Sequence, residues 1–340
     1  MKDRVLLTGV SGFLGGHVAL ELLKSGYTVR GSVRNLSRAD KVRATLEKAG
    51  ADSARLEFVA LDLESDEGWQ EAMDGVRFLQ HTASPFVLQM PSDKNDLIRP
   101  AVEGTERALN AALAANVERV VLTSSMAAIA YGHDKSRAAP FTANDWTNLE
   151  GRDVTPYTES KTRAERRAWE IMRAAGREKD LATINPSGIF GPLLDEDPGT
   201  SAILVQRLMN GSVPASPRMP LVAVDVRDVA RAHLAAMTAH QAGGHRFPMG
   251  ERTMFFSEVA TVLRNAFPDY AKKIPKRELP DWMVRIYALF DRDVRSNLGE
   301  LGVLKRLDSS AVIRLLDRKL TPADASFIAT GESLIAHGLV

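Results

Sequence analysis

Short apolar runs alternate with longer amphipathic stretches through the first 185 residues of the chain. The apolar runs predict strands, and the stretches between them, with apolar residues every three to four positions, predict helices. The predicted strands cover residues 4–8, 27–33, 56–61, 78–81, 119–123 and 181–185. The predicted helices cover residues 13–24, 38–49, 67–73 and 94–115, and a further helix begins near Tyr157. This alternation is typical of an α/β fold with a doubly wound parallel sheet, covered by helices on both faces.

The alternation weakens after residue 185, where Asn185-Pro186-Ser187-Gly188 and Gly191-Pro192 interrupt the pattern. A strand at 221–226 and a helix at 227–237 are predicted to return to the sheet. A final helix is predicted near 325–337. The later residues are therefore expected to form a smaller second lobe.

A glycine-rich turn, Thr8-Gly9-Val10-Ser11-Gly12-Phe13-Leu14-Gly15, lies between the first predicted strand and the first predicted helix. Glycines permit a tight turn and let backbone N–H groups approach a pyrophosphate, and the helix N-terminus adds partial positive charge. Within a first βαβ unit, this spacing predicts a dinucleotide site on a Rossmann-type fold. We expect residues 1–186, with 221–240 returning to them, to form the dinucleotide-binding domain. Residues 187–220 and 241–340 would form the substrate-binding lobe.

The end of the second predicted strand indicates which dinucleotide binds. Sites for NAD commonly carry an acidic residue there, which binds the ribose 2′-hydroxyl. This chain has Arg34 instead, and Lys41 follows in the next element. Both cations could hold a 2′-phosphate, so NADP(H) is favoured over NAD(H). Asp62, after the third strand, could accept a hydrogen bond from the adenine amine or simply cap a turn.

A tyrosine and a lysine, Tyr157 and Lys161, lie four residues apart and hence on one face of a helix. The ammonium would lower the tyrosine pKa, and such a tyrosine can donate its proton to a carbonyl oxygen as hydride arrives. Thr123-Ser124-Ser125 ends the fifth predicted strand, at the edge where ligands bind in open α/β sheets. A hydroxyl there can polarise the same carbonyl oxygen.

These motifs together resemble the extended short-chain dehydrogenase/reductases, and among them the dihydroflavonol reductase-like carbonyl reductases. The resemblance covers most of the chain. Its motifs are TGVSGFLG at 8–15, TVRGSVRN at 28–35, LDL at 61–63, TASP at 82–85, RPAVEGT at 99–105, TSS at 123–125, YTESK at 157–161, NPSGIFGP at 185–192, VDVRDVARAH at 224–233 and GESLIAHGLV at the C-terminus.

The resemblance implies NADP(H)-dependent reduction of an aldehyde or ketone to an alcohol. It implies that Ser125 is the catalytic serine, Tyr157 the acid/base, and Lys161 the residue that binds the nicotinamide ribose. It also assigns residues around the cofactor. These are Thr8, Gly9, Ser11, Gly12, Phe13, Leu14 and Gly15 in the glycine turn, Arg34 and Lys41 at the 2′-phosphate, Asp62 and Leu63 after the third strand, Thr82 and Ser84 beside the cofactor, and Pro186 and Ser187 at the nicotinamide.

One position departs from the plant dihydroflavonol reductases, which carry an asparagine five residues beyond the catalytic serine. Ala130 occupies that position here, so a smaller or more apolar carbonyl compound than a flavonoid is favoured. Apolar side chains along the chain are candidates for the substrate pocket, although each could equally belong to the core. They are Phe86, Met126, Ile129, Trp146, Ile189 and Tyr287.

Composition narrows the remaining possibilities. The chain has 340 residues, 44 basic against 43 acidic, and no cysteine. The charge balance shows no basic excess for nucleic acid, and the missing thiols exclude a disulfide, a thiolate metal site and a cysteine nucleophile. The seven histidines have no metal-binding spacing, so no metal is expected. No apolar run is long enough to cross a membrane, which favours a cytoplasmic protein. The related enzymes suggest a monomer, or a homodimer paired through 94–115 and 157–175.

Two alternatives stay open. The first is a sugar-nucleotide epimerase or dehydratase with tightly held NAD, for which Arg207, Arg218 and Lys305 could reach a nucleotide diphosphate. Arg34 argues against it. The second is a non-catalytic NADP-sensing protein, against which the intact Tyr157 and Lys161 pair argues.

Overall fold

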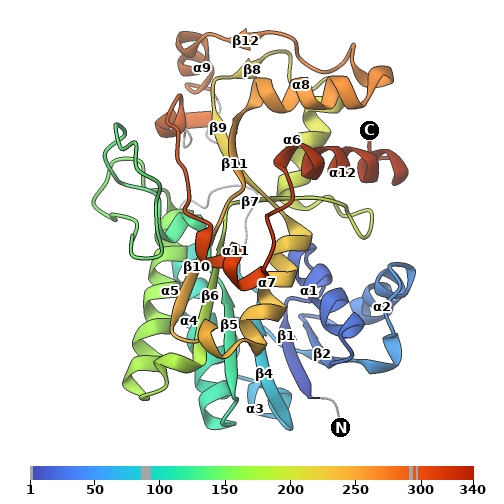
Figure 1. The fold of residues 1–340 in the computed structure, drawn as a ribbon, viewed down its shortest axis with the longest axis vertical. Coiled ribbons are helices and arrows are strands. Elements are labelled where there is room, and N and C mark those ends of the chain that lie inside the picture. Colours follow the sequence, from blue (N-terminus) through green and yellow to red (C-terminus); the bar gives the residue numbers. More distant parts are fainter. Residues whose placement is uncertain (1–2, 86–92, 291–293, 296–297) are drawn as a thin grey trace.

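The computed structural model describes residues 3–85, 93–290, 294–295 and 298–340 (Figure 1). Its centre is a sheet of seven parallel strands in the order β10-β6-β5-β4-β1-β2-β3. These strands are β1 (Arg4–Thr8), β2 (Thr28–Val33), β3 (Leu56–Ala60), β4 (Val76–His81), β5 (Arg119–Thr123), β6 (Leu181–Pro186) and β10 (His245–Met249). The chain leaves β1 in one direction and later crosses to β4 on its other side. This reversal opens a crevice beyond the carboxyl ends of β1 and β4.

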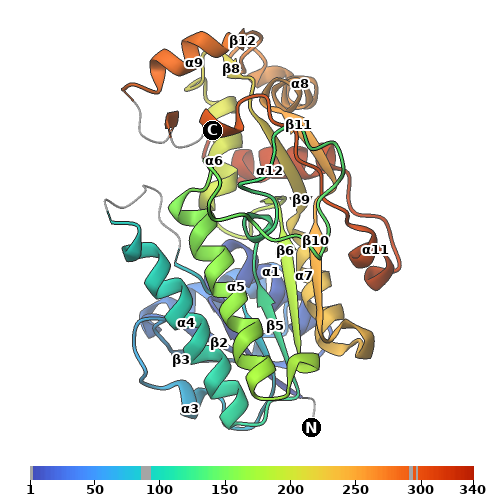
Figure 2. The ribbon, with the colours of Figure 1, turned by 90° about the vertical axis from the view of Figure 1, so that its left-hand side faces the viewer.

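Helices cover both faces of this sheet, as the doubly wound prediction requires. On one face lie α1 (Phe13–Lys24) and α2 (Ala39–Lys48), beside β1 and β2, and α7 (Val226–Thr238), which packs next to α1 over β4, β5 and β6. On the other face lie α3 (Trp69–Ala72), α4 (Asn95–Ala114) and α5 (Pro156–Ala174). Figure 2 shows α4 and α5 side by side along this face. The predicted α/β fold with a parallel sheet is confirmed.

The start of α5 is fixed by its local sequence. Pro156 occupies the first turn, where its missing N–H costs nothing. Thr155 caps the helix, since its hydroxyl accepts from the Thr158 N–H while the Thr158 hydroxyl accepts from the Thr155 N–H. Tyr157 directly follows Pro156 in the first turn of the helix, so this cap also fixes the position of the tyrosine.

A smaller group of elements lies above the central sheet in Figure 1. Its three-stranded sheet has the order β11-β9-β7, and α6, α8 and α12 pack around one apolar core. The strands are β7 (Gly188–Phe190), β9 (Pro220–Asp225) and β11 (Arg252–Phe255), with the pair β8 (Ser216–Pro217) and β12 (Glu278–Leu279) beyond them. The helices of this group are α6 (Gly199–Met209), α8 (Phe256–Ala266), α9 (Asp281–Tyr287) and α12 (Ala323–Ala336), whereas α11 (Ser310–Leu316) packs on α7 and β10 of the central sheet.

The return of the chain to the central sheet differs from the prediction. The helix expected at 227–237 is α7 and does pack on that sheet, but the strand expected at 221–226 is β9 and pairs with β7 and β11. The strand that joins the central sheet is β10, from the part assigned to the substrate lobe. Pro248 interrupts its pattern, and a proline is tolerated there because β10 lies at the sheet edge. The division into two domains otherwise stays a prediction.

Candidate active site

The glycine turn joins β1 to α1 and is closed by its own backbone. The Gly12 N–H donates to the Gly9 carbonyl oxygen at 3.0 Å, and Gly9 has a φ of 72°. A Cβ added to Gly15 would lie 2.1 Å from the Gly9 oxygen, so any side chain there would push the turn away from the helix. The turn therefore needs glycine for both its conformation and its close packing.

A cavity of about 700 Å³ opens beside this turn, above the carboxyl ends of β1, β2 and β4. Most of the residues assigned to the cofactor line it, namely Thr8, Gly9, Ser11, Gly12, Phe13, Arg34, Asp62, Leu63, Thr82 and Ser84. Leu14 instead packs against the main core, and Gly15 contacts the turn from behind. The Asp62 carboxylate also accepts the Glu64 N–H at 3.0 Å, so it holds a turn while facing the cavity.

The cations near the cavity are not quite those that the sequence indicated. Arg34 lines it, but Lys41 forms an ion pair with Glu196 at 3.1 Å and is not among the lining residues. Arg38 lines it instead. Arg38 ends a short 3-10 helix whose first turn is capped by Asn35, and that turn brings Arg38 to the same side as Arg34. The sequence analysis missed Arg38, although its spacing of four residues from Arg34 was a usable signal.

Ser125 and Tyr157 meet beyond the carboxyl end of β5. Ser125 caps a 3-10 helix, its hydroxyl oxygen accepting the Ala127 N–H at 3.1 Å, and it forms a side-chain hydrogen bond with Tyr157. The Lys161 Nζ lies 5.9 Å from the centre of the Tyr157 ring. The three predicted catalytic residues are thus brought together from two elements, and their roles stay predictions.

The ionisation of this group differs from expectation. Burial raises the pKa of Tyr157 above its usual value, and the hydrogen bond with Ser125 only partly opposes this. Burial also lowers the pKa of Lys161 to about 8. The expectation that Lys161 lowers the tyrosine pKa is therefore wrong in this structure, because removing both side chains from water favours their neutral forms.

Two more residues assigned to the cofactor end β6. Pro186 is the last residue of that strand, and the Ser187 N–H donates to the Met249 carbonyl oxygen at 2.8 Å. The Ser187 hydroxyl is buried and has no hydrogen-bond partner among the described residues. A bound ligand could supply the missing partner, which fits the predicted place of the nicotinamide.

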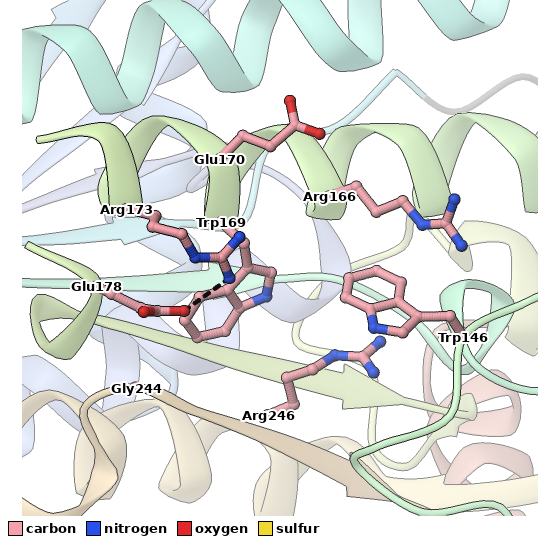
Figure 3. Close-up of a pocket in the computed structure, with 8 residues that line it drawn as sticks. All are labelled: Trp146, Arg166, Trp169, Glu170, Arg173, Glu178, Gly244 and Arg246. Carbon is pink, nitrogen blue, oxygen red and sulfur yellow. Dashed lines mark hydrogen bonds and ion pairs between the residues drawn. The ribbon is translucent and has the colours of Figure 1, made fainter.

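The apolar residues proposed for the substrate pocket are scattered. Met126 and Ile129, both predicted for the pocket, are instead buried together in an apolar cluster with Ala130, Phe141 and Val222. Ile189 packs against the main core, and Tyr287 is 55 % exposed on α9. Trp146 lines a separate surface pocket of about 430 Å³ with Trp169, Arg166 and Arg246 (Figure 3). Phe86 lies outside the described residues.

The cations that kept the epimerase alternative open are largely engaged elsewhere. Arg218 forms an ion pair with Asp281, and Lys305 pairs with Glu300 and lies 4.2 Å from the centre of the Tyr131 ring. Arg207 lies in the last turn of α6. In the part of the chain that the structure describes, no group of His, Asp or Glu side chains could hold a metal ion. Across these same residues, no helix has the length and apolar character required to cross a membrane.

Known proteins resemble the chain along most of its length. The model of the "NAD dependent epimerase/dehydratase family" matches residues 5–250. Tetraketide alpha-pyrone reductase 2 of Arabidopsis thaliana is 34% identical over 272 residues, covering 78% of this chain and 83% of the relative. Cinnamoyl-CoA reductase CAD2 of Medicago truncatula is 36% identical over 270 residues, covering 78% and 81%. The crystal structure of yeast methylglyoxal/isovaleraldehyde reductase Gre2 with NADPH superimposes with a TM-score of 0.81 at 26% identity, covering 99% and 100%.

Proposed function

The chain belongs to the NAD dependent epimerase/dehydratase family, and we propose that it is an NADP(H)-dependent reductase that converts an aldehyde or ketone to an alcohol. The observation that carries this proposal is the hydrogen bond between the side chains of Ser125 and Tyr157, with Lys161 one helical turn further along α5. This group stands at the carboxyl edge of the sheet that also forms the glycine turn and its cavity.

The residues present fit NADP(H). The backbone of the glycine turn lines the cavity at Gly9 and Gly12, and Arg34 and Arg38 face the same cavity beside the end of β2. The end of β2 carries no carboxylate for a ribose 2′-hydroxyl. The solved structure of the yeast reductase contains NADPH, which supports the same choice for this chain. When bound, NADPH would supply the hydride that reduces the carbonyl carbon.

The chain's own residues would manage the oxygen of the substrate. Ser125 and Tyr157 would both donate hydrogen bonds to it, and Tyr157 would pass its proton to the oxygen as negative charge develops there. A neutral tyrosine suits this task, because the proton must be present at the start of the reduction. Lys161 would hold the nicotinamide ribose and, when protonated, stabilise the phenolate that remains.

The substrate would be a small carbonyl compound. The names of the relatives include reductases of a tetraketide pyrone, of cinnamoyl-CoA, and of methylglyoxal and isovaleraldehyde, and these differ widely in size. Ala130 has only a methyl group, packed beside Met126 and Ile129, so this position offers no polar contact to a flavonoid. We therefore favour a compact, weakly polar aldehyde or ketone.

The test compares NADPH and NADH, followed by loss of reduced-nicotinamide absorbance, against a panel of aldehydes, ketones and diketones. We expect NADPH to be consumed well ahead of NADH. Tyr157→Phe keeps the ring but removes the proton donor, so kcat should fall by about 10²–10⁴-fold. Absence of turnover with any carbonyl, together with NAD bound to the purified protein, would instead favour an epimerase or dehydratase.

A further inference from the structure

A carboxylate lies buried directly behind the proposed catalytic group. Glu165 is on α5, one helical turn beyond Lys161 and two beyond Tyr157, and its side chain is 0 % exposed. Five side chains donate hydrogen bonds to its two oxygens. They are Ser124 at 2.6 Å, Asn185 at 2.7 Å, Thr183 at 3.1 Å, Trp169 at 3.3 Å and Arg246, which contacts both oxygens at 2.6 and 3.1 Å.

Arg246 keeps this carboxylate charged. Burial alone would raise the pKa of Glu165, but the neighbouring guanidinium and the hydrogen bonds together bring it below its usual value. Arg246 is itself secured, because it donates to the carbonyl oxygens of Ala143 and Asp145 at 2.8 and 2.6 Å. Its guanidinium lies 3.7 Å from the centre of the Trp146 ring, and Figure 3 shows Trp146 between Arg246 and Arg166. The Trp146 ring therefore packs against the Arg246 guanidinium where both line this surface pocket.

The partners of Glu165 lead to the proposed site along two strands. Ser124 immediately precedes Ser125 at the end of β5. Asn185 precedes Pro186 at the end of β6, and its Nδ2 also lies 3.4 Å from the Ser125 carbonyl oxygen. The carboxylate thus joins three segments: the end of β5 with Ser125, the end of β6 with Pro186, and α5 with Tyr157 and Lys161.

We propose that Glu165 is a positioning residue for the reaction, which holds Ser125 in register with Tyr157 through Ser124 and Asn185. This inference rests on the proposed function. All the groups that face the two carboxylate oxygens donate hydrogen bonds to them. The isosteric Glu165→Gln replaces one oxygen with an NH₂ group, which would then face N–H donors instead of an acceptor. It also leaves the Arg246 charge without its partner in a buried place. Ser125 would then move relative to Tyr157, and small displacements of reacting groups can slow chemistry by about 10²-fold.

The experiment measures Glu165→Gln in the full chain beside the wild type and a matched control. Asp228→Asn is the control, because Asp228 is also fully buried, pairs with Arg231 at 3.2 Å, and lies on α7 outside the proposed machinery. We expect both variants to melt at lower temperature. At a temperature where both are folded, Glu165→Gln should lower kcat by about 10–100-fold, with the Kd of NADPH changed less than threefold. Asp228→Asn should retain kcat within about threefold.

The rate of hydride transfer separates positioning from general loss of structure. In single turnovers with NADPH deuterated at the transferred position, Glu165→Gln should show a slow step with a clear isotope effect. A Glu165→Gln enzyme with wild-type kcat, or one in which kcat falls no further than in Asp228→Asn, would overturn the inference while leaving the proposed function intact. A wild type that reduces no carbonyl compound would overturn the proposed function and this inference with it.

A second variant serves if Glu165→Gln does not fold. Ser124→Ala removes one donor to the carboxylate, at the residue next to Ser125, and leaves the ion pair with Arg246 in place. We expect kcat to fall about fivefold with the Kd of NADPH unchanged, in keeping with the loss of one charge-assisted hydrogen bond. Wild-type kcat in a folded Ser124→Ala protein would count against positioning through this network.

Discussion

The turn after β1 and the buried centre around Glu165 serve the same proposed site but depend on different kinds of contact. Around the glycine turn, the residues that form the site follow one another along the chain, and the hydrogen bond from the Gly12 N–H to the Gly9 carbonyl oxygen joins residues only three positions apart. Around Glu165, Trp169 lies in the same helix, but the other four partners are 18 to 81 positions away in the sequence, from Thr183 to Arg246. The first region is encoded locally, whereas the second exists only when the whole sheet is assembled.

Folding of the whole sheet buries histidines that are exposed to water in the unfolded chain, and this should make the protein sensitive to acid. Three histidines are buried and neutral: His17 beside the Pro192 carbonyl, His81 beside Thr8, and His233 between Gln80 and Thr123. Burial is the main cause that lowers their pKa values, to about 4, 3 and 3.

Each of these histidines takes up a proton near pH 6.5 when unfolded but not until about pH 4 or 3 when folded. Their contribution to stability is therefore present above pH 6.5 and is lost as the pH falls toward 4. Each should cost up to about 1.4 kcal/mol per pH unit in this window, so unfolding by denaturant at pH 7, 6 and 5 should show a steep decline. His233→Gln should flatten the curve. An unchanged free energy of unfolding between pH 7 and 5 would contradict these pKa values.

The local region should instead be sensitive to a single methyl group. Gly15→Ala places a Cβ 2.1 Å from the Gly9 carbonyl oxygen, and we expect a loss of about 1–3 kcal/mol in the free energy of unfolding. Gly16→Ala is the matched control in the same helix. Its added Cβ would lie 3.3 Å from the end of the Leu194 side chain and 3.9 Å from the Val10 carbonyl oxygen, so the helix propensity of alanine should offset these milder contacts. Equal melting temperatures for the two variants would show that the turn can relax.

Comparing the affinities for NADPH and NADH tests whether the region around the glycine turn binds the 2′-phosphate. Arg34→Ala removes a cation from the cavity, and we expect the Kd of NADPH to rise about 10–100-fold, as for the loss of a charge-assisted hydrogen bond. The Kd of NADH should change less than threefold, because NADH has no 2′-phosphate. Titration of protein fluorescence with both nucleotides measures this. Equal weakening of the two would place Arg34 at another part of the nucleotide.

The local region was the part that sequence reasoning could predict. The strand at 119–123, the helix at 13–24 and the glycine turn followed from patterns within a few residues, and the structure has them at these bounds. The other contacts could not be predicted, because they join residues that lie far apart in the sequence. The sequence around Glu165 gives no sign that Arg246 is its partner. Pro248 interrupts the pattern of the edge strand that carries Arg246, so that strand was not predicted. Ile129 is apolar in either place, so its pattern could not separate a pocket wall from the core.

Arg38 and Lys41 allow the most specific test of this difference. The family resemblance indicates Lys41 as a ligand of the 2′-phosphate, whereas the structure places Arg38 at the cavity. Lys41→Ala removes a half-exposed ion pair with Glu196, and such pairs contribute little, so we expect the Kd of NADPH to change less than about threefold. Arg38→Ala should weaken NADPH more, by about fivefold, since Arg38 lines the cavity with Arg34. The reverse order would mean that Lys41 leaves Glu196 for the phosphate when the nucleotide binds. The motif would then describe the bound protein better than the cavity does, and Glu196→Gln should tighten NADPH binding by freeing the lysine.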